Sequence, residues 1–130
     1  MTHEEFEKTV AEEFERAIPE KFREHIRNVA FLIEDEPSHE VRVREGLQEG
    51  ETLLGYYHGV PTPARGDWYG MGTTMPDTIT LYRLPILKVA EEDNLPVGQV
   101  VRETIWHEVA HHFGMDEHEV RRREDERDIL

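Results

Sequence analysis

The sequence predicts an α+β fold, in which helices and short strands build one domain over residues 1–130. Three observations support this prediction. The chain starts with an amphipathic helical pattern and closes with a long and a short helical pattern, and three short runs typical of β-strands lie between them. A chain of 130 residues can also bury one modest core but not two.

Two helices are predicted at the N-terminal end. Thr2 and Glu5 have the spacing of a capping box, and apolar residues then recur every three or four positions. A first helix is therefore expected over residues 2–17. Pro19 can open a second short helix, because the fixed backbone angle of proline suits a first helical turn.

The middle of the chain predicts strands and one short helix. Residues 28–33 form an apolar run typical of a buried strand, and Ser38 can cap a helix over residues 38–45. Two further strands are expected, and the second alternates apolar and polar residues like a half-exposed strand: residues 53–57 and 78–82. The connection over residues 60–76 is unusually long, so a functional loop and an idle hairpin excursion both stay open.

The C-terminal part predicts three helices. Pro85 fits the first turn of a helix that reaches residue 92. A long helix is expected over residues 96–113, and Gly114 follows it at the position where glycine commonly ends helices. Asp116 and Glu119 have the spacing of a further capping box, which predicts a final charged helix.

Composition limits the classes of partner. The formal net charge is −14, which repels phosphate groups, so neither nucleic acid nor an anionic membrane is expected as a partner. The absence of cysteine excludes disulfides and cysteine-ligated metals. No apolar stretch approaches the roughly 20 residues of a membrane helix, and the acidic N-terminus lacks a signal-peptide pattern. We therefore expect a soluble cytoplasmic protein.

The long C-terminal helix contains the pattern that indicates chemistry. His107 and His111 are four residues apart, so both imidazoles project from one face and can reach one Zn²⁺ ion. Glu108 lies beside them, where it could accept a proton from a metal-bound water. His112 lies about 100° further round the helix, so we expect it off the metal face. The alternative is a pair of partly exposed helix histidines.

A catalytic zinc site needs a third protein ligand, and the acidic segment after Gly114 can supply it. In the extended pattern H-E-x-x-H-x-x-G-x-x-[H/D], the last position falls on Glu117. His118 is the main rival. Asp116 competes less well, because as an N-cap it would turn its carboxylate toward backbone N–H groups.

The chain resembles the bacterial minimal zincin family, a group of zincin-like metallopeptidases. The resemblance covers nearly the whole chain, and the following segments carry it: residues 18–22, 28–29, 34–37, 53–56, 59–61, 76–83 and 107–114. It implies a compact zincin core, with a small mixed sheet packed against helices and the metal-site helix near the C-terminus. Family members usually carry Asp at the position of Glu117, whose side chain is one methylene longer.

The resemblance also implies a zinc metallopeptidase that acts on peptides or proteins. His107, His111 and Glu117 would hold Zn²⁺, and Glu108 would be the general base. In zincins an extended substrate lies along an edge strand, and residues 78–82 are expected to be that edge, the alternative being an ordinary sheet edge. Five residues are candidates for stabilising the oxyanion: Tyr56, Tyr57, Arg65, Tyr69 and Tyr82.

Two other functions are compatible with a metal site on this helix. The protein could be a non-catalytic, zinc-stabilised module that binds proteins or peptides. It could also be an RNA-processing hydrolase, since one rRNA-maturation family uses a similar helical metal site. The net charge of −14 and the absence of His at position 117 disfavour that third function.

Overall fold

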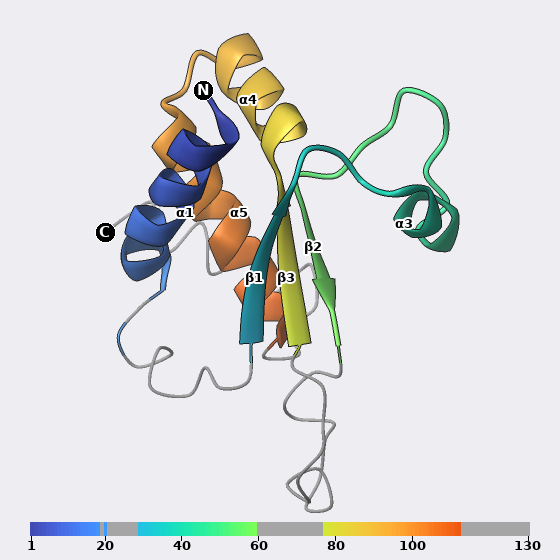
Figure 1. Cartoon of the computed structure of the whole chain (residues 1–130), viewed down its shortest axis with the longest axis horizontal. Helices are drawn as coiled ribbons and strands as arrows, with labels where there is room; N and C mark the ends of the chain where they lie inside the picture. The colour runs from blue at the N-terminus through green and yellow to red at the C-terminus, as the bar shows by residue number, and fades with distance from the viewer. Residues whose placement is uncertain (19, 21–28, 60–76, 113–130) are drawn as a thin grey trace, which may run out of the picture.

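The computed structural model describes residues 1–18, 20, 29–59 and 77–112 (Figure 1). Helices and a small mixed sheet make up this part of the chain, which confirms the predicted α+β class. Its elements are α1 (His3–Ala17), β1 (Val29–Glu34), α3 (His39–Arg44), β2 (Gly55–His58), β3 (Asp77–Tyr82), α4 (Arg83–Glu92) and α5 (Val97–His112). None of the helices in these ranges has both the length and the apolar character needed to cross a membrane.

Three predictions lie outside the described residues. They are the second short helix opened by Pro19, the long connection over residues 60–76, and the final helix after Asp116. The predicted boundaries elsewhere agree with the structure to within one or two residues.

Local capping signals fix where α1 and α3 begin. At α1 the Glu5 amide donates to the Thr2 hydroxyl at 3.1 Å, and the Thr2 amide donates to the Glu5 carboxylate at 3.4 Å. The Ser38 hydroxyl accepts from the Val41 amide at 3.2 Å, so Ser38 caps α3 as predicted. Both caps satisfy backbone donors that a first helical turn leaves without partners.

The sheet has the strand order β1-β3-β2, with β3 in the centre. β3 pairs in parallel with β1 and antiparallel with β2, so that Leu81 lies opposite both Ile33 and Gly55. The prediction that residues 78–82 form a half-exposed edge strand is therefore wrong. The alternation misled because Thr80 and Tyr82, on the polar-looking face, are also buried. A strand buried on both faces belongs in the middle of a sheet.

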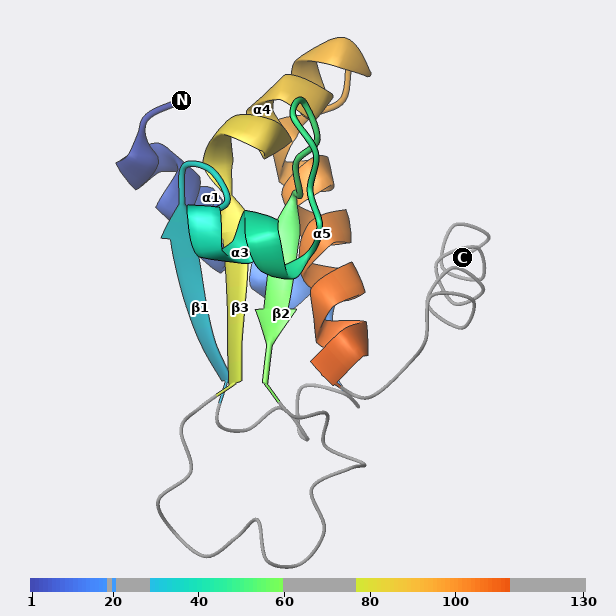
Figure 2. The same cartoon turned by 90° about the vertical axis from the view of Figure 1, so that its right-hand side faces the viewer.

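Helices cover the two faces of the sheet unequally. Figures 1 and 2 show α1 and α5 together on one face and the short helix α3 on the opposite side. The main core lies under α1 and α5 and includes these fully buried side chains: Phe6, Ile79, Leu81, Ile86, Val101, Ile105 and Val109. α5 packs against α1, α4, β2 and β3. This helix is therefore held on several sides, as a functional site on it would require.

Candidate metal centre and active site

The predicted motif lies in the last turns of α5, at the border between core and surface. Val109 and Ala110 are buried within the core, while His107, Glu108 and His111 are half-buried. Core packing of the intervening pair therefore fixes the rotation of the helix. The three polar side chains are held in place and still reach the surface.

His107 and His111 lie side by side, as their spacing predicts. Their ring centroids are 5.0 Å apart, and the ring planes meet at 68°, in an edge-to-face arrangement. Imidazole is the commonest metal ligand in proteins, and two rings on one helix face fit a single Zn²⁺ ion. The described pair therefore fits a zinc site in its chemistry and its placement.

The third predicted ligand, Glu117, lies outside the described residues, as do its rivals His118 and Asp116. Within residues 1–18, 20, 29–59 and 77–112, no three His, Asp or Glu side chains lie close enough to hold a metal ion. The described part of the chain thus contains two of the three residues that the sequence predicts as ligands, His107 and His111.

Glu108 lies against the start of β2. A Cβ atom added to Gly55 would be 3.0 Å from the Glu108 Cγ atom and 2.9 Å from the Thr104 Cγ2 atom. Contacts this short are tighter than side chains normally make, so the strand can approach α5 this closely only because residue 55 is glycine. Sequence reasoning did not identify Gly55, although a glycine inside a strand pattern signals a close backbone approach.

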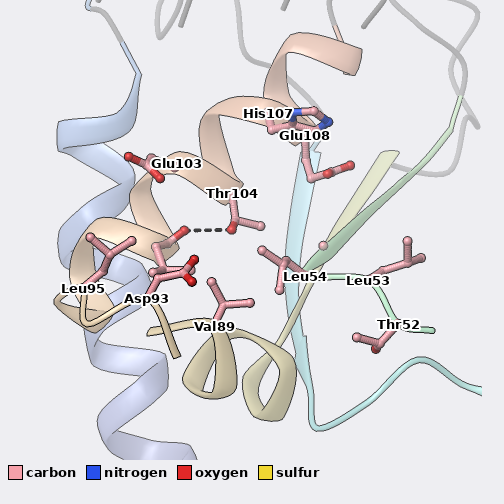
Figure 3. Close-up of a pocket in the computed structure, with 12 residues that line it drawn as sticks. Thr52, Leu53, Leu54, Val89, Asp93, Leu95, Glu103, Thr104, His107 and Glu108 are labelled. Carbon is pink, nitrogen blue, oxygen red and sulfur yellow. Dashed lines mark hydrogen bonds between the residues drawn. The ribbon is translucent and has the colours of Figure 1, made fainter. Parts of the chain in front are cut away.

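A cleft of about 420 Å³ opens beside His107 and Glu108. Its walls come from the segment that leads into β2, the end of α4 and one side of α5: Thr52, Leu53, Leu54, Gly55, Val89, Asp93, Leu95, Val100, Glu103 and Thr104. Figure 3 shows His107 and Glu108 together at one end of this cleft and Asp93 and Leu95 at the other. The sequence motif therefore adjoins a cavity of the size that binds small ligands or single side chains.

The three described candidates for stabilising the oxyanion lie in different surroundings. Tyr57 shares the helix-facing side of β2 with Gly55, and its hydroxyl donates to the Asp77 carboxylate at 2.6 Å. Tyr56 lies on the opposite face, where burial raises its pKa and Arg44 of α3 contacts its hydroxyl. Burial also raises the pKa of Tyr82 to about 12. The remaining candidates, Arg65 and Tyr69, lie outside the described residues.

Asp77 is a second acidic group that sequence reasoning did not identify. It is only 2% exposed, and its carboxylate packs directly on the backbone of Gly59. A buried carboxylate needs hydrogen bonds, and the Tyr57 hydroxyl supplies a short one. The pair joins the end of β2 to the start of β3 on the side that faces α5.

Comparison with known proteins identifies the family. A family model described as a zincin-like metallopeptidase matches residues 26–127, which is more than half of the chain. The chain belongs to the zincin-like metallopeptidase family. This zincin-like family consists in general of zinc-dependent hydrolases whose substrates are peptides or proteins. A search of the curated proteins found no match to the chain.

Proposed function

We propose that this zincin-like protein hydrolyses peptide bonds, with Glu108 as the general base. His107, His111 and Glu117 would hold a zinc ion, which would supply Lewis acidity at the scissile carbonyl and lower the pKa of a water molecule toward 7. Glu108 would accept the proton of the attacking water and deliver it to the leaving amine. The cleft beside Glu108 supports this proposal most directly, because it gives a substrate room next to the proposed base.

Strand β2 is the element best placed to align an extended substrate. It is an edge strand of the described sheet, and no described strand pairs with its outer side. Its first residue, Gly55, contacts Glu108. A peptide added to this edge would gain backbone hydrogen bonds and would run past the proposed base. We therefore propose for β2 the substrate-aligning role that the sequence suggested for residues 78–82.

The same observations favour an enzyme over a zinc-stabilised binding module. A purely structural zinc site is closed by four protein ligands, whereas a catalytic site keeps an open position. His107 and Glu108 both line the cleft and are half-buried, so a substrate can reach them.

The substitution Glu108→Gln tests the proposed base. The side chain keeps its size and loses its ability to accept the proton, so cleavage should fall by about 10²- to 10⁴-fold while the zinc content stays unchanged. Cleavage of a peptide mixture is followed by mass spectrometry, and Glu12→Gln on the exposed face of α1 is the matched control. Wild-type activity in the Glu108→Gln protein would contradict the proposal. Zinc-loaded wild type that cleaves no peptide would favour the binding module.

A further inference from the structure

The cleft beside Glu108 combines apolar walls with carboxylate groups. Its apolar surface comes from Leu53, Leu54, Val89, Leu95 and Val100. Three carboxylates also line it: Asp93, Glu103 and Glu108. Among the described residues that line the cleft, none is Lys or Arg. The cleft therefore suits a ligand with an apolar stem and a positively charged end.

The backbone adds negative potential at the end of the cleft far from Glu108. Asp93 is the C-cap of α4, a helix of 10 residues. A helix C-terminus carries a partial negative charge, so a carboxylate at this position is unfavourable for the helix itself. No basic residue lies in the last turn of α4 to offset this charge. A cation bound near Asp93 would relieve the repulsion.

The basic side chains near the cleft pair with carboxylates outside it. On α5, the Arg102 guanidinium donates to the Glu13 carboxylate of α1 at 3.3 Å. On α4, the Lys88 ammonium lies 3.8 Å from the Glu92 carboxylate and does not line the cleft. Glu103 receives a hydrogen bond at 3.3 Å only from the neutral amide of Gln99 among the described residues. Neither of these described cations therefore pairs with Asp93 or Glu103.

We propose that this cleft is a specificity pocket that binds the Lys or Arg side chain of a peptide substrate, next to the bond that is cleaved. This inference rests on the proposed peptidase function. The methylene groups of the substrate side chain would pack on Leu54, Val89 and Val100. Its charged end would meet Asp93 at the far end of the cleft (Figure 3), and Glu103 would add negative charge from the α5 wall.

Binding of small probes tests the pocket without relying on catalysis. The probes are N-acetyl-arginine amide, N-acetyl-lysine amide and N-acetyl-norleucine amide, and the readout is the NMR amide shifts of the zinc-loaded full chain. We expect the two basic probes to shift the resonances of Leu54, Val89 and Thr104, and to bind about tenfold more tightly than the norleucine probe. Higher salt should weaken binding of the basic probes only.

Variants of the pocket provide the matched comparison. Asp93→Asn and Glu103→Gln should each reduce the affinity for the basic probes about three- to tenfold and leave the norleucine probe unaffected. Glu12→Gln should leave the affinity for the basic probes and for the norleucine probe unchanged. Equal affinity for the three probes, or shifts confined to other parts of the chain, would overturn the inference.

Cleavage of matched peptides separates the two proposals. Peptides that differ only by Arg, Lys, Leu or Glu at one position should be cleaved fastest when that residue is basic. Cleavage without such a preference overturns the pocket and leaves the peptidase function standing. Selective binding of the basic probes without any cleavage supports the pocket and contradicts the peptidase function.

Discussion

At the scale of single residues, Gly55 sets the distance between β2 and the proposed base. An added Cβ atom would push on both Thr104 and Glu108, at 2.9 and 3.0 Å. Glu108 lies on a helix that is packed on several sides, so the strain would fall on its side chain and on the edge strand. Both are parts of the proposed active site.

Gly55→Ala should therefore lower kcat for peptide cleavage about 10- to 100-fold while zinc stays bound. Thr104→Ser removes the Cγ2 atom and should restore part of the lost activity in the double variant. Full activity of Gly55→Ala would show that the close contact has no role in catalysis.

The sequence could predict contacts within one helix but not contacts between a helix and the sheet. The placement of His107 beside His111 depends on helical spacing alone, so it could be predicted. The contact between Gly55 and Glu108 joins residues 53 positions apart and depends on the pairing of β2 with β3. The hydrogen bond between Tyr57 and Asp77 depends on the same pairing. A single sequence does not specify such a register.

At the scale of elements, a buried carboxylate connects α1 to α5. Glu13 on α1 is 5% exposed and accepts hydrogen bonds from Arg16 at 2.9 Å and from Arg102 of α5 at 3.3 Å. Arg102 lies two residues before Thr104, in the part of α5 that lines the cleft. This ion pair thus helps to hold α5 in position.

Arg102→Met should destabilise the fold by about 1–3 kcal/mol, because it removes a charged partner from a buried carboxylate and keeps the apolar stem. Arg16→Met is the control, since the Arg16 side chain is 66% exposed and its removal should cost about 0.2–1 kcal/mol. Urea denaturation measures both free energies of unfolding. A smaller loss for Arg102→Met than for Arg16→Met would contradict this role of the ion pair.

The sequence predicted the described elements better than their arrangement. Helix-capping residues and apolar periodicity located α1, α3 and α5, because these signals act within a few residues. The order of the strands could not be obtained in this way. The polar-looking face of β3 contains Thr80 and Tyr82, which are buried in a strand that has a neighbour on each side. Only the assembled sheet shows that this strand is central.

At the scale of the whole molecule, a small α+β core presents one helix that carries His107, Glu108 and His111, with an acidic cleft beside it. Membership in the zincin-like metallopeptidase family agrees with this arrangement. The strongly acidic composition, with a net charge of −14, fits the proposed binding of basic side chains in the cleft. The fold, the family and the charge thus support the same proposal, a zinc peptidase.

The central claim is that His107 and His111 hold a catalytic zinc ion on α5. Metal content, measured by mass spectrometry on full-length protein purified without chelator, tests it most directly. We expect about one zinc ion per wild-type chain, and loss of that zinc in His107→Ala, His111→Ala and Glu117→Ala but not in His118→Ala. Wild type that binds no zinc after reconstitution, or zinc that remains when both histidines are replaced, would contradict the claim.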